Sequence, residues 1–473
     1  MSAVPEIVPP SGSEPATDGR LVSSRGPLVS ASMGMVAVVS YGGTLLLAHL
    51  LDAPSYSVYA AAATMLGTVG VFAAALIPLP LTAVIRSHPS RSEERCRGVT
   101  FAWVVAAGAG LLAAVITGLV TALFAPLTVA AAVAASALVL FLCSPVWGWL
   151  YGYLLFVRKA VMTVAEACVR VLVSAGVVLL GWGAGAALTG FMAGSAVVLL
   201  SAPRVLARDL AWRPGVLRER DRWVETGDLA VAQLIVYSLV GADVVLVAVL
   251  AAHDVESAGY QALSTLAKAP VFVAAGGAAV AFPLLRGRHP DTGHILTVTL
   301  RSFAVFALSS AAVVATAPPA VVLLVFPDRY ARSLWLLPVL AAAGVGYAVL
   351  TMLTTVMLGL RAYRRCQVGL LAAAVVMATG LVSGWRIDAV SGLGVGAAVG
   401  ALSAAGALWV AAVPLLPART TRRAVYALFL AGALAALLAL AGRVPVLWVC
   451  CVLVLGAVVL RLAGRNFPAS APW

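Results

Sequence analysis

The chain has little of what a water-soluble protein needs. Only 10% of its 473 residues are charged, whereas an average soluble domain carries about 25%. In contrast, 62% of the residues are hydrophobic, and the mean hydropathy is +1.04. Polar surface this scarce cannot cover a soluble globule of this length. The composition therefore excludes a soluble enzyme, a disordered scaffold and a secreted disulfide framework.

The sequence also lacks the motifs that carry enzyme chemistry. It contains no Walker A motif, no His-Glu-x-x-His, no Cys-x-x-Cys and no credible Ser/His/Asp set. Its six cysteines lie in or beside apolar runs without the spacing of metal ligands, which is typical of small core hydrophobes. We therefore expect a protein that is not an enzyme, with no catalytic residue, no metal site and no bound cofactor.

Lysine is scarce as well, and basic charge is confined to few places. There are two Lys and 29 Arg, and nearly all lie in short segments between apolar runs. Such segments commonly face the cytoplasm, where they contact anionic membrane lipids. The net charge of +13 therefore predicts a membrane surface as the partner, and no nucleic acid.

Long apolar runs are what the sequence has in excess. Runs of about 18 or more residues cross a bilayer only as helices, because every backbone amide in lipid must bond within its own segment. The sequence therefore predicts an all-α polytopic membrane protein with about fourteen transmembrane helices. The predicted spans are 30–51, 56–85, 99–123, 127–156, 160–181, 184–203, 228–251, 257–285, 298–326, 332–359, 366–385, 390–416, 423–441 and 444–462.

The distribution of basic residues predicts the orientation of these helices. Residues 1–27 have no apolar core of a signal peptide, so we expect them to form a disordered cytoplasmic tail. With the N-terminus inside, 25 of the 31 basic residues fall in cytoplasmic segments and only four in outer loops. This bias predicts a multi-pass protein of the plasma membrane (the cell inner membrane) with both termini in the cytoplasm.

The two halves of the chain resemble each other. Tyr59-x4-Thr64 recurs as Tyr260-x4-Thr265, and three further matches follow in the same order at offsets between 201 and 211 residues. A repeat of six helices, an even number, predicts two parallel six-helix lobes, and transporters place their substrate path between such lobes. The predicted parts are a tail (1–27), an N-lobe (28–205), a basic linker (206–227), a C-lobe (228–418), and helices 13 and 14 with a short tail (419–473).

Four charged residues fall inside predicted spans, where a charge is costly and marks a candidate site. Glu166 and Arg170 stand at i, i+4 on one helix face. Asp243 and Lys268 lie at similar depth on helices 7 and 8, so they can pair across that hairpin. We predict that the four residues line a substrate-binding cavity between the lobes. The alternative is that each pair only stabilises helix packing.

Among these residues, Arg170 is the strongest candidate for binding an anion, because a guanidinium grips phosphate with two hydrogen bonds. The acids Asp243 and Glu166 qualify for coupling transport to H⁺ or Na⁺ only if they are unpaired.

Three further residues are candidates for gating. Pro80 and Pro283 occupy matching places in the repeat, on helices 2 and 8, and proline breaks the backbone ladder of a helix. Matched irregular helices indicate moving parts. His49 lies near the outer end of helix 1, where a change of protonation could act on a gate. An interfacial histidine without such a role is the alternative.

Three stretches resemble a known family: Leu46–Leu66 with its Tyr-bearing turn, Trp149–Leu172 followed by "GWGAGAALTG", and Ile235–Leu285 with its helix 7 Asp and Gly-Tyr turn. The family is the polysaccharide exporters and oligosaccharide-lipid flippases of the multidrug/oligosaccharidyl-lipid/polysaccharide (MOP) exporter superfamily. The resemblance covers about residues 30–420. The first three predicted helices contain no Arg or Lys, which argues against the lipid II flippases of that superfamily.

The resemblance implies a flippase that moves a lipid-linked oligosaccharide, on polyprenyl pyrophosphate, from the inner to the outer leaflet by alternating access. Arg170 and Lys268 would then hold the pyrophosphate, and a polysaccharide polymerase and glycosyltransferases would be functional partners. Two alternatives stay open. One is a cation-coupled multidrug exporter of the same fold. The other is a membrane-embedded polysaccharide polymerase or glycosyltransferase, which the short outer loops disfavour.

Overall fold

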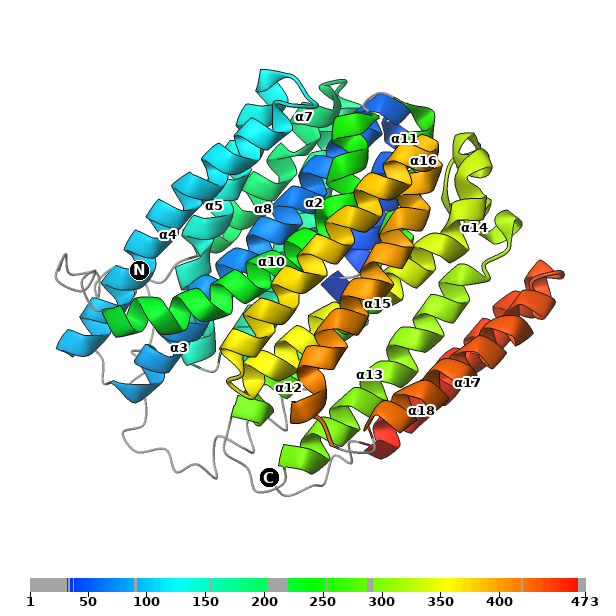
Figure 1. The fold of residues 1–473 in the computed structure, drawn as a ribbon. Coiled ribbons are helices and arrows are strands. Elements are labelled where there is room, and N and C mark those ends of the chain that lie inside the picture. Colours follow the sequence, from blue (N-terminus) through cyan, green and yellow to red (C-terminus); the bar gives the residue numbers. More distant parts are fainter. Residues whose placement is uncertain are drawn as a thin grey trace.

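The computed structural model describes residues 32, 35, 36, 38–88, 92–153, 155–201, 220–251, 254–286, 292–417 and 420–466. These ranges contain helices and turns but no strand. The helices lie side by side in one bundle (Figure 1). The prediction of an all-α protein is therefore confirmed. The tail expected over residues 1–27 lies outside the described residues, as does most of the expected linker.

The N-lobe begins with a short first helix, Val38–Leu50. The labelled helices that follow are α2 (Ala53–Leu76), α3 (Pro78–Ser87), α4 (Glu93–Thr121), α5 (Leu127–Gly152), α6 (Phe156–Leu179), α7 (Gly183–Ala187) and α8 (Thr189–Leu200).

The C-lobe begins at Arg220, within the range expected for the linker. Its elements are α10 (Arg220–Leu250), α11 (Val255–Ala267), α12 (Ala269–Arg286), α13 (Thr292–Ala315), α14 (Pro319–Val325), the 3₁₀ helix η2 (Asp328–Leu336), α15 (Leu337–Gly359), α16 (Tyr363–Ala412) and the 3₁₀ helix η3 (Val413–Leu415). Two helices follow, α17 (Thr420–Ala441) and α18 (Pro445–Asn466), and both pack on α13.

When the segments of broken helices are grouped and α16 is divided at its kink, the described elements form the fourteen helices that the sequence predicts. Helix 2 is divided into α2 and α3, helix 6 into α7 and α8, and helix 8 into α11 and α12, whereas α16 contains helices 11 and 12. Ten helices in the described ranges are long and apolar enough to span a membrane, and Val38–Leu50 and Pro445–Val459 are shorter apolar helices.

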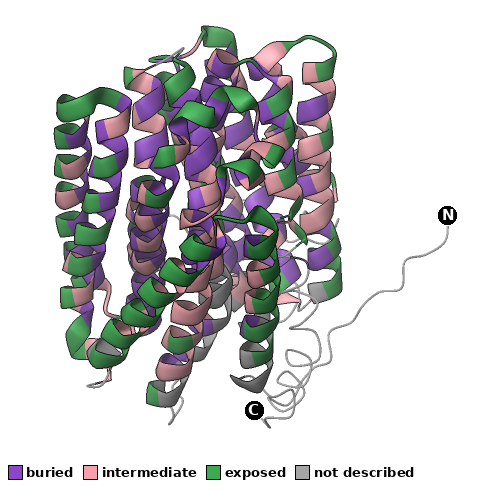
Figure 2. Cartoon of the chain, turned by 90° about the vertical axis from the view of Figure 1, so that its right-hand side faces the viewer, coloured by how far each residue is buried: buried purple, intermediate pink, exposed green. Residues whose placement is uncertain are grey.

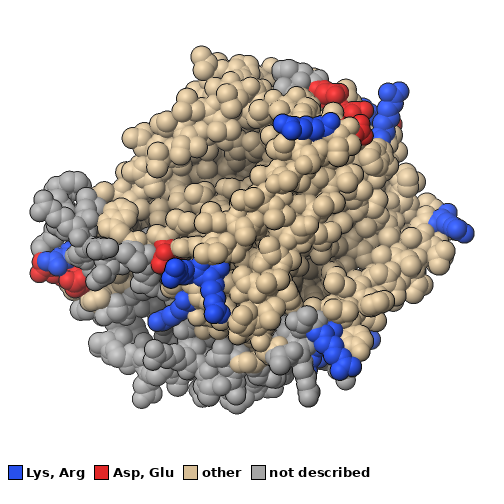
Figure 3. All heavy atoms as spheres, viewed as in Figure 1, with Lys and Arg blue, Asp and Glu red and all other residues tan. Residues whose placement is uncertain are grey.

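The surface of the bundle is that of a multi-pass membrane protein. Large side chains such as Leu119, Val375 and Phe429 are well exposed on its outside. Figure 2 shows exposed residues along the outer helices, with buried residues gathered inside the bundle. Charged side chains lie near the two ends of the face seen in Figure 3, and the band between them is almost free of charge. Such an extended apolar surface requires lipid around it.

The two ends of the bundle are distinguished by name below. We call the end that carries Arg361, Arg364 and Arg365 the basic end and the opposite end the far end. The α3 helix and the carboxyl end of α12 lie toward the basic end in Figure 1. That the basic end faces the cytoplasm stays a prediction.

Helices 11 and 12 form a tight hairpin within α16. The chain reverses near Ala389, which has a φ of 39°. Glycines line the contact between the two helices. A Cβ added at Gly384 would lie 2.2 Å from the carbonyl oxygen of Gly392, and one at Gly396 would lie 2.2 Å from that of Gly380. No larger residue fits these positions, so the two backbones touch along the hairpin.

Prolines set two helix boundaries that differ from the predicted spans. The predicted span 298–326 is interrupted, because α13 ends at Ala315 and α14 begins at Pro319. Pro338 likewise stands in the first turn of α15, so the span expected from 332 begins as the 3₁₀ helix η2. Proline suits the first turn of a helix because its missing N–H needs no partner there. These prolines therefore start helices instead of kinking them.

Candidate functional site

The two lobes meet along α2 and α10. The hydroxyl of Thr68 donates a hydrogen bond to the carbonyl oxygen of Tyr237 at 3.4 Å. One turn along α10, Gly241 permits close approach, since a Cβ there would lie 3.0 Å from Cγ2 of Thr64. Small and hydroxyl side chains let membrane helices pack closely. We call this contact the lobe seam.

At the far end, polar contacts close the lobe seam. Ser57 and Ser257, near the starts of α2 and α11, share a hydrogen bond of 3.2 Å. Arg329 of η2 donates to the carbonyl oxygens of Ala48 and Leu51, the second at 2.6 Å. These carbonyls end the first helix, where acceptors lack helical partners and a cation is favoured. Sequence reasoning assigned Arg329 to an outer loop and missed this role, because one loop arginine carries no signal of its partner.

In the N-lobe, Glu166 and Arg170 form an ion pair on α6. Nη1 of Arg170 lies 3.0 Å from Oε1 of Glu166, and Nη2 donates to the hydroxyl of Ser40 at 2.9 Å. The Glu166 side chain is 15% exposed and the Arg170 side chain is 20% exposed. The guanidinium carbon also lies 5.1 Å from the ring centroid of Phe191. The pair is thus local to one helix, and Ser40 connects it to the first helix.

In the C-lobe, Asp243 and Lys268 pair across the hairpin, as their depths predict. Nζ of Lys268 lies 2.9 Å from Oδ1 of Asp243. Oδ2 accepts hydrogen bonds from the hydroxyls of Tyr260 at 3.1 Å and Ser264 at 3.2 Å. Asp243 is fully buried, and Lys268 lies over the ring of Tyr347. Both carboxylate oxygens are therefore engaged, which compensates the cost of a buried charge.

Lys268 stands at a break in helix 8. The α11 helix ends just before it and α12 begins just after it. Pro270 lacks the N–H that would continue the backbone ladder. The hydroxyl of Tyr41 donates to the carbonyl oxygen of Thr265 at 3.2 Å, and its ring packs on Phe272 with the centroids 5.3 Å apart. Tyr41 therefore contacts helix 8 on both sides of the break.

Adjacent residues of the first helix thus reach both charged pairs. Ser40 accepts a hydrogen bond from Arg170 in the N-lobe, and Tyr41 contacts the break at Lys268 in the C-lobe. The first helix is a physical link between the two sets of charges. Sequence reasoning identified the charges but neither of these two residues, because a serine and a tyrosine in an apolar run give no distinct pattern.

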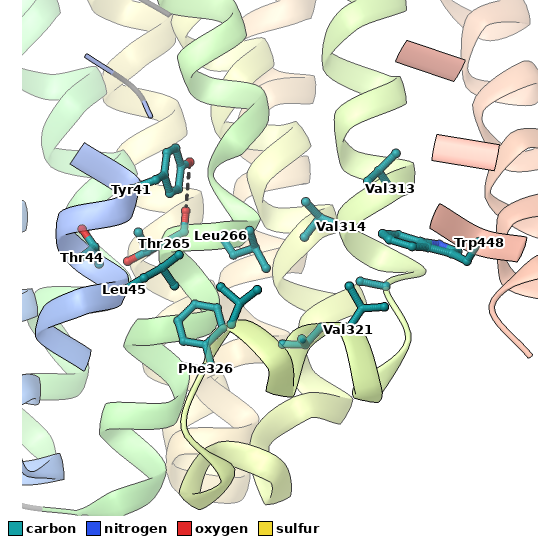
Figure 4. A pocket seen from close by; sticks show the side chains of 13 residues that line it. Tyr41, Thr44, Leu45, Thr265, Leu266, Val313, Val314, Val321, Phe326 and Trp448 are labelled. Atoms are coloured by element: carbon teal, nitrogen blue, oxygen red, sulfur yellow. Dashed lines mark hydrogen bonds between the residues drawn. The ribbon is translucent and has the colours of Figure 1, made fainter. Parts of the chain in front are cut away.

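An apolar cavity of about 190 Å³ lies beside Tyr41 (Figure 4). The first helix and α11 provide one wall, α13 and α14 provide another, and Trp448 of α18 closes a third. The indole N–H of Trp448 donates to the hydroxyl of Thr316 at 3.2 Å, which ties α18 to the end of α13. None of the four predicted charges lines this cavity, but its wall includes Leu266, two residues before Lys268.

The predicted gating residues lie on irregular helices, apart from His49. Both helix 2, with Pro80, and helix 8, with Pro283, are broken. The breaks fall at Ile77 and Lys268, so they do not match in the repeat, and neither predicted proline stands at the break itself. His49 is exposed, and its Nδ1 lies 2.9 Å from the carbonyl oxygen one turn earlier in its own helix. A gating role for these residues stays a prediction.

Arg95 is a buried charge that sequence reasoning placed in a cytoplasmic segment. The α4 helix begins at Glu93, before the predicted start at 99, and Arg95 is only 2% exposed within the bundle. Its guanidinium donates to the hydroxyl of Tyr153. The signal for the earlier start was present, since Ser92 precedes two glutamates and its side chain caps the helix.

No protein-family model matches the chain, and no curated protein matches its sequence. Solved structures do match its fold. Lipid II flippase MurJ, in an inward closed conformation, has a TM-score of 0.71 at 10% identity, covering 93% of this chain and 99% of that chain. An inward-facing multidrug resistance MATE family transporter of the MOP superfamily has a TM-score of 0.61 at 14% identity, covering 82% and 97%. The chain has the fold of these two proteins.

A further match, the eukaryotic MATE transporter AtDTX14, has a TM-score of 0.54 at 14% identity and covers 87% of this chain and 98% of that chain. The three matched proteins are transporters or flippases. The MurJ match spans about 440 of the 473 residues, more than the 419 that precede α17, so it reaches into the segment after residue 419. The two MATE matches span about 388 and 412 residues and need not reach that segment.

Proposed function

We propose that this MOP-type transporter is a flippase for a lipid-linked oligosaccharide carried on polyprenyl pyrophosphate. It moves this cargo from the inner to the outer leaflet of the plasma membrane for assembly of a cell-surface polysaccharide. The observation that carries the proposal is the apolar cavity beside Tyr41, whose wall includes Leu266, two residues before Lys268 in the chain. An apolar cavity beside the helix that carries this cation suits a cargo with a hydrocarbon tail and an anionic head.

The extent of the fold match supports a lipid cargo. Trp448, in a wall of the cavity, lies in the segment after residue 419, which the MurJ match must partly include and the MATE matches need not. MurJ is named as a flippase of lipid II, and the MATE proteins as multidrug or MATE transporters. The segment that distinguishes the first comparison thus also contributes a residue to the apolar cavity.

Two cations within the bundle can bind the pyrophosphate. Arg170 and Lys268 each hold a carboxylate, at 3.0 Å and 2.9 Å, which limits the cost of isolated charges in the membrane. Arg170 contacts only one oxygen of Glu166 and has further N–H donors. A pyrophosphate offers more oxygens and more negative charge than that carboxylate, so it can take over the guanidinium.

Alternating access follows from rocking of the lobes about the lobe seam. The far-end contacts, Ser57 with Ser257 and Arg329 with the end of the first helix, must open before cargo can leave toward the outer leaflet. Ser40 and Tyr41 connect the two charged pairs, so cargo on Arg170 changes contacts that reach the break in helix 8. Glycosyltransferases that make the cargo and a polysaccharide polymerase that uses it are the partners this function needs.

A cation-coupled multidrug exporter is the second candidate. The buried carboxylates of Asp243 and Glu166 favour it, since H⁺ or Na⁺ coupling needs an acid within the lobes. Each acid is already bound to a cation in the structure. Coupling would therefore require that one of the ion pairs opens during transport.

The deciding experiment is mass spectrometry of polyprenyl-linked saccharides from cells that lack the protein, beside complemented cells. We expect the complete lipid-linked oligosaccharide to accumulate and its surface polymer to be lost, and complementation to reverse both. An unchanged lipid pool contradicts the proposal. Altered drug susceptibility of the same strain then favours the exporter.

A further inference from the structure

Two turns at the basic end match in the sequence repeat, Tyr151-Gly-Tyr-x4-Arg158-Lys159 and Leu358-Gly-Leu-x3-Arg364-Arg365, but they use their basic residues in different ways. In the N-lobe, Arg158 and Lys159 stand in the first turn of α6, just after the turn that follows α5. Arg158 donates to the carbonyl oxygen of Ser201 at 3.3 Å, and Nζ of Lys159 lies 4.3 Å from the ring centroid of Tyr151. Both cations are therefore engaged within their own lobe.

The matching C-lobe turn, between α15 and α16, leaves its cations open. Arg361, Arg364 and Arg365 are all exposed. Within the described ranges, none of the three side chains makes a hydrogen bond, an ion pair or a ring contact. They line an open groove of about 510 Å³. The other lining residues are Asp228, Ala362, Tyr363, Gln367 and Leu415.

The groove carries a surplus of positive charge. Its single carboxylate, Asp228, accepts a hydrogen bond from the side-chain amide of Gln367 at 2.8 Å. Three guanidinium groups against one carboxylate leave a net charge of +2 among the lining side chains. Like charges gathered in one groove repel one another, so a multivalent anion stabilises the arrangement.

The backbone of the turn adds a second observation. Arg361 has a φ of 59°, in the left-handed region where glycine is the usual residue. This conformation costs a non-glycine residue roughly 1 kcal/mol. The conformation closes the carboxyl end of α15, where the N–H of Ala362 donates to the carbonyl oxygen of Met357 at 2.8 Å, and it fixes the turn from which the three arginines project.

The groove lies at the depth of lipid headgroups. The apolar span that includes α15 ends at Gly359, two residues before Arg361. On the opposite wall, Leu415 follows Val410 and Val413, which are 73% and 44% exposed. Cationic side chains thus stand beside exposed apolar ones, at the edge of the hydrocarbon region. A soluble anion needs only the cationic side chains, whereas a lipid uses both the cationic and the exposed apolar side chains.

We propose that this groove, named here the C-lobe groove, binds the phosphate group of a membrane lipid. Arg364 and Arg365 hold the phosphate oxygens, and the acyl or isoprenoid chains run along the exposed apolar side of α16. Two lipids share this chemistry: a glycerophospholipid with an anionic headgroup, and a polyprenyl pyrophosphate. The second source rests on the proposed function, because it would be the cargo carrier docking before entry.

The test is native mass spectrometry of the purified full-length protein titrated with phosphatidylglycerol, polyprenyl pyrophosphate, phosphatidylcholine and inorganic pyrophosphate. Arg364→Gln/Arg365→Gln removes two groove cations. Arg158→Gln removes an engaged cation from the repeat-related turn and is the matched control. We expect the double variant to weaken binding of an anionic lipid by about tenfold or more, and the control to change it by less than about twofold.

A second variant acts in the opposite direction. Asp228→Asn removes the one carboxylate among the described residues that line the groove, so it should raise the affinity for an anionic lipid several-fold. Because this change strengthens binding, a loss of folding cannot imitate it.

The outcomes separate the sources. Preference for phosphatidylglycerol identifies a glycerophospholipid site, and preference for polyprenyl pyrophosphate identifies a carrier site. Equal binding by the wild type, the double variant and the control overturns the proposal, because it shows only general attraction of a basic surface. Binding of inorganic pyrophosphate without either lipid also overturns it. These measurements involve no transport, so their failure is independent of any failure of the flippase proposal.

Discussion

Glu166 and Arg170 stand one turn apart on a single helix, whereas Asp243 and Lys268 come from two helices joined by a hairpin. In the N-lobe pair, Arg170 is 20% and Glu166 15% exposed, and among the described residues Arg170 has one carboxylate oxygen and one hydroxyl as polar partners. The C-lobe pair is more buried, at 12% for Lys268 and 1% for Asp243, and its carboxylate also holds two hydroxyls. A pair with spare donors can exchange partners, and a fully engaged pair holds helices in place. We therefore assign cargo contact first to Arg170, and positioning of the helix 8 break to Asp243.

The largest expected effect in this comparison is the loss of the Asp243 charge. Asp243→Asn leaves Lys268 buried without its counter-ion, which should lower the free energy of unfolding by about 3–5 kcal/mol. Denaturant unfolding of the purified protein in detergent measures this. Glu166→Gln, in the pair that keeps 15% and 20% of its side chains exposed, should cost less, about 1–3 kcal/mol. Equal losses for the two variants would remove the distinction between the pairs.

Reversing each pair sharpens the same comparison. Glu166→Arg/Arg170→Glu keeps an i, i+4 pair on one helix, so the protein should insert and fold with a stability within about 1 kcal/mol of the wild type. Asp243→Lys/Lys268→Asp moves the carboxylate away from the hydroxyls of Tyr260 and Ser264. We expect little folded protein in a gel-filtration assay. A well-folded C-lobe reversal would show that only charge balance matters there.

Arg170→Gln tests the functional half of the comparison. Loss of a charged hydrogen-bond partner costs about 1.5–3 kcal/mol, so transport of cargo should fall by roughly 10- to 100-fold. The melting temperature should change little, since the side chain is partly exposed. Accumulated lipid-linked oligosaccharide in cells carrying this variant, at normal protein levels, is the readout. Restored export by the reversed pair, Glu166→Arg/Arg170→Glu, would argue that the pair acts only in packing.

The smallest expected effect concerns the link between the two pairs. Tyr41→Phe removes the hydrogen bond to Thr265 but keeps the ring contact with Phe272. Hydrogen bonds between membrane helices contribute about 0.6 kcal/mol on average, so stability should fall by about that amount in thermal unfolding. Ser40→Ala is the matched change toward Arg170. A loss of several kcal/mol of stability from Tyr41→Phe would show that the first helix stabilises the fold as well as linking the two pairs.

The helices and the pairing of charges were predictable because the membrane leaves few alternatives. A backbone in lipid must be helical, so apolar runs marked nearly all the crossings. Buried charges in lipid need partners, so the equal depths of Asp243 and Lys268 were enough to pair them. The boundaries near Pro319 and Pro338 were less accurate, since a proline inside an apolar run can either kink a helix or start one.

The contacts that connect the lobes could not be predicted from the sequence. Tyr41 and Thr265 are 224 residues apart, and Arg329 lies 278 residues from the carbonyl of Leu51 that it caps. The sequence periodicity of a helix does not indicate which distant helix it contacts. Arg95 shows the same limit on a smaller scale, because Tyr153, to which it donates, lies 58 residues away at the end of α5. Local rules thus predicted the crossings, and long-range packing decided how the site is connected.

The glycine contacts within α16 have a consequence for how the chain is made. Gly384 and Gly392 are eight residues apart, and Gly380 and Gly396 are sixteen apart, so this hairpin can close as soon as helix 12 leaves the ribosome. In contrast, the hydrogen bond between Ser57 and Ser257 can form only after more than half of the chain has been synthesised. The N-lobe therefore spends the first part of biosynthesis without its partner surface. The last helices of the C-lobe enter the bilayer as a pair that is already joined.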